Sequence, residues 1–514
     1  MAIDPIPAPC FPEAPFCNLS GPMPEDADVL SVQLSPDGGR VVYTADRDQD
    51  QVAELFSVPV LRGARQRLNV PAGGSGGGVI SIAVSPDGAR VLYRFIRAQG
   101  QPAALFSVPI RGPGSASVLL AEDVAQLSDP PQQGFRVSAD SQVVVYLTPD
   151  GRQLRAVPIA GPAGASIPLT RPFVPDGRLS SFEIAPDSRR VFYLAGQDSA
   201  AIEGLYRVGL RPPDPSNPPT TRLSAADVAA VRFLLSPTDR AVLYQGASEA
   251  DGPSLYRVGF SGSVSRKRSH DLPPDFRISQ RDWTVTPSGH RLVYRVIEPL
   301  PGGQLRFQLH SAPTTGPRGN VRLDRPQAEP SPSVQVSADG NRVVYWSPAG
   351  LFSVPVDGPA GATVRLNPQP SAAGVSTFFA ISPNSRRVVY EVEAEDGPID
   401  LFSVPIGGPA DAGVKLNQSE KAGLPFLVDA TSTRVVYRGT PDDIRKDLYS
   451  VPIDAVGRRS RPTAGIDRCT VFILLLTPDG QRAVYTAEQG GQLVRPAELY
   501  SSPLNVQVAD PGEG

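Results

Sequence analysis

The chain repeats one pattern of apolar and polar positions ten times. Each copy ends on a tyrosine, and the positions nine and eleven residues before it are always large and apolar, as in Val32, Leu34 and Tyr43. The residue between those two positions varies through glutamine, alanine and arginine in the first three copies. An alternation with a period of two predicts a short strand with one buried face. The ten tyrosines lie 45 to 53 residues apart, at Tyr43, Tyr93, Tyr146, Tyr193, Tyr244, Tyr294, Tyr345, Tyr390, Tyr437 and Tyr485.

A turn and a second strand follow the first strand in every copy. Two copies read SPDGGRVVY from Ser35 and SPDGARVLY from Ser85. Proline presets φ at the second turn position and glycine accepts a positive φ at the fourth, which predicts a tight hairpin turn. The aspartate position holds Asp37 in the first copy but threonine or serine in others, so its side chain is expected to bond turn backbone rather than to catalyse. The Val-Val-Tyr segment is apolar on both faces and predicts a strand covered on both sides, with the preceding arginine at its rim.

Two more strands complete each copy. The first is the LFSVP element, as at Leu55 and Leu105, whose proline becomes glycine in LYRVG at Leu205 and therefore marks a strand end. The second is a short strand such as VRLN at Val364. Four short antiparallel strands per repeat of about 49 residues are the pattern of β-propeller blades. The sequence thus predicts an all-β fold, a single β-propeller of about ten four-stranded blades.

The two ends of the chain are predicted to share the tenth blade. The last repeat stops after its third strand, at Leu504, whereas Leu19-Ser20 near the N-terminus resembles the fourth-strand pairs Leu223-Ser224 and Leu366-Asn367. An N-terminal strand would therefore close the propeller by supplying the missing edge. The predicted organisation is a proline-rich segment over residues 1–15, a propeller over 16–504 in which residues 16–20 complete the last blade, and a tail over 505–514. Docking of this strand onto a second molecule, giving a strand-exchanged oligomer or filament, is the alternative to a monomer.

The turn and LFSVP elements carry a family resemblance. SPDG-x-RVVY and LFSVP resemble the Pro-Asp repeats of TolB-like propellers, distant relatives of WD-repeat proteins, over roughly residues 16 to 504. The resemblance implies the fold, and it favours a bacterial protein that is periplasmic, secreted or exposed at the cell surface. TolB itself has fewer blades and an added α/β domain, so its envelope partners are not implied here.

Composition narrows the function classes. The net charge of −3 among 514 residues gives no field that would attract nucleic acid. The sequence has no apolar run of about 18 residues that could span a bilayer, and the first residues lack the pattern of a signal peptide. Cys10 and Cys17 are close enough to pair in an oxidising compartment, whereas Cys469 lies in an apolar run.

One loop carries a candidate metal site. Asp46, Asp48, Asp50 and Glu54 alternate in the way that a calcium loop collects oxygen ligands. The glycine expected at the sixth position is Gln51, and the glutamate expected at the twelfth is Ser57. A solvated acidic loop is the competing interpretation, and no other cofactor is predicted.

Other candidate chemistry is weaker. The run from Gly73 to Gly77 matches G-x-S-x-G, but no helical pattern follows it as a nucleophile elbow requires. His270, His290 and His310 lack metal-ligand spacing, although the fold could bring them together. No catalytic residue is predicted.

The leading hypothesis is a non-enzymatic scaffold that binds a protein or polymeric partner through the loops of one face. The first alternative is a small-molecule or glycan binder that uses the central channel, with Gln33, Arg136, Glu183 and Gln335 near its lining. The second alternative is a propeller hydrolase or lyase.

Overall fold

The structure is a computed structural model whose described residues form two compact units. The first unit comprises Met1–Pro149, Arg155–Ile167 and Leu416–Gly514, and the second comprises Asp150–Leu154 and Pro168–Lys415. The described residues are 16–61, 63–71, 77–128, 131–171, 173–249, 252–262, 264–273, 275–316, 319–325, 333–368, 374–393, 399–418, 420–441, 446–464, 466, 470–488 and 497–505.

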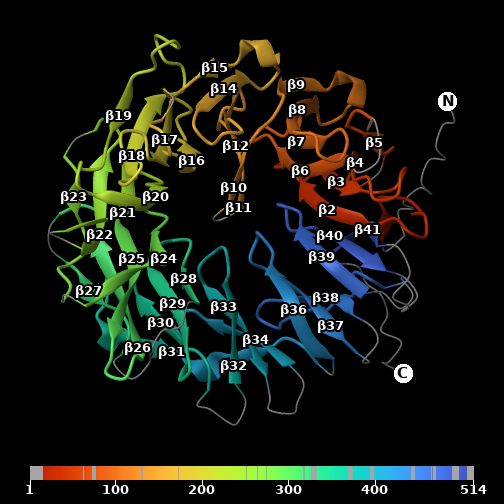
Figure 1. Ribbon diagram of the computed structural model, residues 1–514. Coiled ribbons are helices and arrows are strands. Elements are labelled where there is room, and N and C mark those ends of the chain that lie inside the picture. Colours follow the sequence, from red (N-terminus) through yellow and green to blue (C-terminus); the bar gives the residue numbers. More distant parts are fainter. Residues whose placement is uncertain are drawn as a thin grey trace. The chain divides into compact units, whose positions relative to one another are not determined.

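The fold is all-β, as predicted. The described residues form ten antiparallel sheets with the strand arrangement of propeller blades, nine of them four-stranded (Figure 1). Blade nine has three strands and, at the fourth position, an isolated antiparallel bridge between Ser450 and Ser460. We name the strands of each blade A to D in chain order. Because they are antiparallel, D–A and B–C loops share one end of a blade, the D–A end, and A–B turns and C–D loops share the other, the C–D end.

The first unit contains blades one, two, three, nine and ten, with Leu154 and Pro168 of blade three assigned to the second unit. Their strands are β2 (Val29–Leu34), β3 (Arg40–Ala45), β4 (Glu54–Pro59) and β5 (Gln66–Arg67); β6 (Gly78–Val84), β7 (Arg90–Ile96), β8 (Ala103–Pro109) and β9 (Val118–Ala121); β12 (Phe135–Val137), β13 (Val143–Leu147), β14 (Leu154–Pro158) and β15 (Ile167–Pro168); β36 (Lys421–Val428), β37 (Arg434–Thr440) and β38 (Asp447–Pro452); β39 (Thr470–Leu476), β40 (Arg482–Glu488), β41 (Glu498–Pro503) and β1 (Cys17–Asn18). A two-stranded ribbon precedes blade three, formed by β10 (Gln126–Ser128) and β11 (Pro131–Gln133).

The second unit contains blades four to eight. Their strands are β16 (Leu179–Ile184), β17 (Arg190–Ala195), β18 (Gly204–Gly209) and β19 (Thr220–Arg222); β20 (Ala229–Leu235), β21 (Ala241–Ser248), β22 (Gly252–Gly259) and β23 (Arg266–Lys267); β24 (Arg277–Val285), β25 (Arg291–Pro299), β26 (Leu305–Pro313) and β27 (Val321–Arg322); β28 (Val334–Val336), β29 (Arg342–Ser347), β30 (Gly350–Pro355) and β31 (Val364–Arg365); β32 (Gly374–Ile381), β33 (Arg387–Glu393), β34 (Ile399–Pro405) and β35 (Val414–Lys415). Single 3-10 turns precede the D strands of blades two, three, seven and eight, at Gly114–Ala116, Ala163–Ala165, Ala360–Ala362 and Ala410–Ala412.

The repeated tyrosine is the centre of each blade. All ten copies are buried, and in most blades the ring stacks on the aromatic residue at the second position of the C-strand motif, as Tyr43 does on Phe56 at 5.4 Å between ring centroids. Clusters of apolar side chains then join neighbouring blades, for example Leu55 of blade one with Ile82 and Tyr93 of blade two. The apolar position eleven before the tyrosine is buried in most blades, whereas the position nine before it is only half-buried in all ten. The predicted A-strand face is therefore buried mainly at one of its two positions.

The turn after the A strand has the predicted geometry. Gly38 has φ of 69°, and four copies that lack glycine hold serine in the same left-handed region, including Ser188 with φ of 53°. The Asp37 carboxylate accepts hydrogen bonds from Ser35 Oγ (2.5 Å) and from the Gly39 backbone N–H (3.0 Å). These bonds, the Ser35 bond most strongly, lower the pKa of Asp37. The aspartate thus organises the turn, as the sequence indicated.

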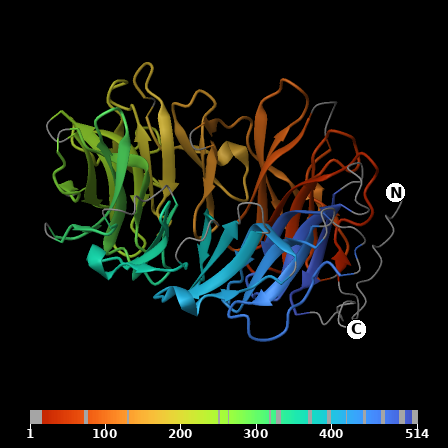
Figure 2. The same ribbon diagram turned by 90° about the horizontal axis from the view of Figure 1, so that it is seen from below.

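The N-terminal strand completes blade ten, as predicted. β1 pairs with β41 in antiparallel register, Cys17 opposite Ser501 and Asn18 opposite Tyr500. Leu19 N–H donates to Leu499 O (2.7 Å), and Leu499 N–H donates to Ser20 Oγ (3.0 Å). Both views show β39–β41 beside β2 and β3 (Figures 1 and 2), in agreement with the apolar cluster that joins blades ten and one.

Candidate binding surfaces

A β-bulge interrupts the A strand in most blades, near its D–A end. In blades one and two the register shifts between Val29 and Ser31 and between Val79 and Ser81. Blade ten shifts between Val471 and Leu474. The extra residue in such a bulge has no partner in the ladder and turns away from it. The bulges therefore decide which side chains the D–A end presents.

Large apolar residues occupy several of these bulges and are exposed. Leu30, Ile80 and Phe472 have 51%, 48% and 47% of their surface accessible in blades one, two and ten. Val231 and Phe378 lie in the corresponding bulges of the second unit and are also exposed. Single exposed apolar residues need no explanation, but their recurrence at one structural position does. The D–A end is therefore a candidate surface for binding an apolar partner.

The four residues proposed for a central channel make different contacts, two of them with the next blade and two within their own blade. Gln33 Nε2 donates to Ile82 O (3.1 Å) and Gln335 Nε2 donates to Phe379 O (2.7 Å), each on the A strand of the next blade. Arg136 bonds its own neighbour, Phe135 O (3.1 Å), and Glu183 pairs with Phe192 in the ladder. The two amides hold neighbouring A strands together and are engaged there.

Two of the four predicted calcium residues lie close together, because the Asp48 backbone N–H donates to Glu54 Oε2 (3.0 Å). Asp48 Oδ2 lies 3.0 Å from Arg67 NH1, and the buried Glu54 carboxylate lies 3.7 Å from the same guanidinium. Asp46 Oδ1 accepts the Asp28 backbone N–H (2.6 Å), and Asp50 is exposed. Burial raises the pKa of Glu54.

The structure leaves the predicted calcium site untested. In the described part of the chain, no three His, Cys, Asp or Glu side chains are grouped as metal ligands. Here Arg67 supplies the positive charge between two of the four carboxylates. Calcium binding in solution stays a prediction.

Two of the three histidines come together, His270 from the D–A loop that follows blade five and His310 from the C strand of blade six. The rings of His270 and His310 stack at 4.8 Å between centroids, and His310 stacks on Tyr294 in place of the usual phenylalanine or tyrosine. Tyr294 donates its hydroxyl hydrogen to Asn320 Oδ1 (3.0 Å), so the 2.9 Å contact with His270 is a bond that the His270 Nδ1–H donates. His290 is exposed in the A–B turn.

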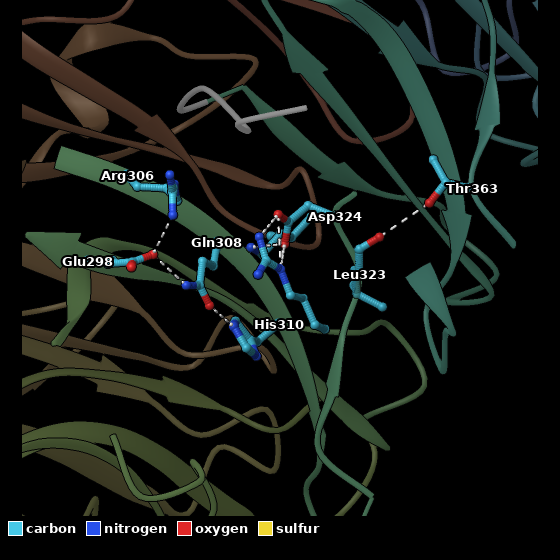
Figure 3. Close-up of polar contacts among 9 residues, drawn as sticks. Glu298, Arg306, Gln308, His310, Leu323, Asp324 and Thr363 are labelled. Carbon is cyan, nitrogen blue, oxygen red and sulfur yellow. Dashed lines mark hydrogen bonds and ion pairs between the residues drawn. The ribbon is translucent and has the colours of Figure 1, made fainter. Parts of the chain in front are cut away.

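A polar chain extends from His310 along the same blade (Figure 3). His310 Nε2 bonds Gln308 Oε1 (3.0 Å), and Gln308 Nε2 donates to Glu298 Oε2 (2.8 Å), which lies 3.6 Å from Arg306. Burial lowers the pKa of His310 to about 3 and also lowers the pKa of His270. Both rings are therefore neutral near pH 7 and act as part of the aromatic stack.

An arginine–serine pair at the C–D end was not anticipated from the sequence. In seven blades the arginine at the start of the B strand donates from Nε to the serine of the C strand over 2.6 to 2.8 Å. Blade four breaks this rule, because Arg207 replaces the serine and Arg190 pairs with Asp187 instead. The departure is visible in the sequence, where LYRVG at Leu205 stands for LFSVP.

Some predicted features lie outside the described residues. These are Cys10, Cys469 and the serine of the G-x-S-x-G match. Cys17 is disulfide-bonded, with a partner outside the described residues. No helix among the described residues is long and apolar enough to cross a membrane.

Comparisons with known proteins give the following. No protein-family model matches the chain, and no curated protein matches it. Solved structures that resemble it include the eukaryotic initiation factor (12% identity, 75% of this chain and 87% of that chain, TM-score 0.46). An oligogalacturonate lyase in complex with manganese resembles it at 14% identity over 62% and 86% of the two chains, with a TM-score of 0.34. Prolyl oligopeptidase B from Galerina marginata resembles it at 12% identity over 74% and 55%, with a TM-score of 0.38. Similarity at this level gives no argument about activity.

Proposed function

We propose that the protein is a non-enzymatic β-propeller scaffold that binds a protein partner through the D–A end of its blades. The observation that carries this proposal is the recurrence of exposed apolar side chains at the A-strand bulges. Leu30, Ile80 and Phe472 belong to consecutive blades of one unit. Apolar clusters join those blades in the order ten, one, two.

The spacing of these three side chains suits a partner with several apolar contacts. Packed sheets lie about 10 Å apart, so the three bulges form a stripe along one end of the first unit. Burying a Leu, Ile or Phe side chain contributes about 1.5–3 kcal/mol. Part of that gain is offset by the entropy lost on association, and a few such anchors are enough for a specific interface.

The family and the compartment are part of the proposal. We place the chain with TolB-like propellers, supported by the Pro-Asp turns that fold as the resemblance implies. We also propose a periplasmic, secreted or cell-surface location, supported by the disulfide bond of Cys17, because such bonds persist in oxidising compartments.

The test compares two sets of exposed apolar residues. Full-length protein is used to capture partners from the native host, and each purified partner is then titrated by calorimetry. The triple variant Leu30→Ser, Ile80→Ser, Phe472→Ser is expected to weaken binding about a hundredfold, which is roughly 2.7 kcal/mol. The matched control replaces three apolar residues of the C–D end, Leu61→Ser, Val264→Ser and Val456→Ser, which are 61%, 78% and 76% exposed.

The control is expected to bind as the parent does. Equal weakening by both triple variants would show a nonspecific apolar effect and overturn the proposal. Unchanged binding of every captured partner by the bulge variant would overturn it as well.

A further inference from the structure

Blade four contains a pocket lined by arginine at its C–D end. The pocket has a volume of about 330 Å³, at the lower end of the range for small-ligand sites. It lies between the start of β17, the end of β18 and the C–D loop, all within the second unit. Its lining includes prolines of the C–D loop together with Arg189, Arg190, Arg207, Arg211 and Thr221.

Positive charge exceeds negative charge around this pocket. Asp187 Oδ2 is shared by Arg190 (2.6 Å) and Arg240 (3.2 Å). Within the described part of the chain, Arg207 donates only to neutral oxygens, Phe260 O (2.6 Å) and Thr221 Oγ1 (2.9 Å). In the described residues, no carboxylate pairs with the side chains of Arg189, Arg207 or Arg211. Asp214 lies on the C–D loop but is not part of the lining, and its carboxylate accepts bonds from Ser216.

Blade five also has arginine in place of the C-strand serine, but there a carboxylate neutralises its charge. This arginine is Arg257. Arg257 NH2 pairs with Asp239 Oδ2 at 2.6 Å. The position of Asp239, five residues before the tyrosine, holds Ser188 in blade four. Blade four therefore has the additional cation without the acid that accompanies it in blade five.

We propose that this pocket binds an oxyanion, a phosphate or sulfate group. Guanidinium groups present several N–H donors in a planar fork that matches tetrahedral oxyanions. Burial, the main cause, and the nearby Arg190 charge lower the pKa of Arg207, and a bound anion would relieve that repulsion. The C–D loop, with five prolines between Arg211 and Thr220, restricts backbone freedom and holds the pocket open before binding.

This inference is independent of the proposed function, because the pocket lies at the C–D end and the bulges lie at the D–A end. The same chemistry is available from free phosphate or sulfate and from a phosphate carried on a polymer. Inorganic phosphate, sodium sulfate and polyphosphate are therefore the probes, with acetate as a planar carboxylate for comparison.

The experiment titrates the full-length protein by calorimetry at constant low ionic strength. Phosphate and sulfate are expected to bind saturably and more tightly than acetate. Arg207→Gln and, separately, Arg211→Gln are expected to weaken binding by about tenfold or more, because each removes one charged donor. The matched control, Arg257→Gln in blade five, is expected to bind like the parent.

Three results would overturn the proposal. They are no saturable binding of either phosphate or sulfate, unchanged binding in both pocket variants, and equal loss in the blade-five control. Circular dichroism shows whether Arg207→Gln folds, and Arg211→Gln on the surface loop keeps the test valid if it does not. Polyphosphate that binds more tightly per phosphate than the free anion, with loss in Arg207→Gln, would assign the site to a polymer-borne group. Equal affinity would assign it to the free anion.

Discussion

Blade ten and blade four have the same D-strand hydrogen bonds, although their D strands come from different places in the sequence. In blade four, Leu223 N–H donates to Leu205 O (2.7 Å) and Leu205 N–H donates to Ser224 Oγ (3.1 Å), and all four strands are consecutive. In blade ten, Leu19 and Ser20 make the same two bonds to Leu499, at 2.7 and 3.0 Å, from the other end of the sequence. The pairing of the D strand thus depends on a local leucine–serine pair, and it does not require that the D strand follow the C strand in the sequence.

The same two blades differ at their C–D end. Arg482 Nε donates to Ser501 Oγ (2.8 Å) in blade ten, whereas blade four has two arginines, Arg190 and Arg207, at the equivalent positions. The buried tyrosines of both blades have 0% exposure. The comparison indicates that the core and the D-strand bonds maintain the fold, while the rim is free to acquire binding chemistry.

The largest expected effect comes from removing the edge strand of blade ten. Deleting residues 1–22 removes the buried Cys17 and Leu19 and exposes the β41 backbone. Leu19 burial alone is worth about 1.5–3 kcal/mol, and an unpaired strand edge promotes association. We expect a lower melting temperature and aggregation, measured by scanning calorimetry and light scattering. Deleting residues 1–9 is the control, because it keeps β1 and Cys10. A 1–22 deletion as stable and monomeric as the control would refute the role of this strand.

The next effect tests whether the two blades have equivalent cores. Phe182 in blade four is fully buried, and Leu474 in blade ten is 7% exposed at the same position of the repeat. Phe182→Ala is expected to lower the free energy of unfolding by about 3–5 kcal/mol and Leu474→Ala by about 2–5 kcal/mol. Denaturant unfolding measures both. A loss below about 1 kcal/mol for either variant would mean that its A strand does not bury this face.

The residue that follows the repeated tyrosine differs between blades, and in blade eight it predicts a pH-dependent stability. Blade ten has Thr486 there, which accepts the Ile473 backbone N–H (3.1 Å), and blade four has Leu194. Blade eight has the buried Glu391, whose Oε1 has no hydrogen-bond partner among the residues that the structure describes. Burial, with a smaller contribution from Glu393, raises the pKa of Glu391 from 4.5 to about 7.

The sign follows from the raised pKa. Below about pH 4.5 Glu391 is protonated in folded and unfolded chains alike. Because the pKa is higher in the folded state, the folded chain binds this proton more tightly than the unfolded chain does. The free energy of unfolding therefore falls as pH rises through about 7. Glu391→Gln is expected to raise the melting temperature at pH 8 and to leave it unchanged at pH 4. Glu393→Gln, at an exposed neighbour, should give a smaller change in the same direction. A gain for Glu391→Gln that is equal at both pH values would contradict this explanation.

Much of the fold follows from the sequence because it depends on local patterns. The spacing of tyrosine and apolar residues predicted the strands, and Leu19-Ser20 predicted the shared blade, since both use short stretches repeated elsewhere. The bulges at Leu30 and Ile80 were not predicted, because the apolar positions counted back from the tyrosine end at Val32 and Ile82, one residue short of the register shifts.

The binding surfaces were less predictable because they depend on contacts between strands. The stack of His270 on His310 joins residues of two blades, and no spacing rule brings them together. The acidic loop from Asp46 to Glu54 was interpreted from its own residues alone, whereas in the structure Arg67, from the next strand, lies beside two of its carboxylates. The pocket in blade four could have been found from the sequence, by asking why LYRVG carries arginine where LFSVP carries serine.

The smallest expected effect comes from the C–D end, where blade ten has an arginine–serine pair and blade four has two arginines. Ser501→Ala in blade ten leaves the Arg482 Nε–H without its acceptor and is expected to cost about 0.5–1.5 kcal/mol. Arg207→Gln in blade four should cost less, because loss of its two hydrogen bonds is offset by relief of its repulsion with Arg190. The repulsion between Arg190 and Arg207 is present in the parent and absent from Arg207→Gln. Because salt screens this repulsion, added salt should stabilise the parent relative to the variant. Thermal unfolding at low and high sodium chloride measures the difference. An Arg207→Gln cost larger than that of Ser501→Ala and insensitive to salt would show that the two arginines do not repel, and that blade four is as well balanced at its rim as blade ten.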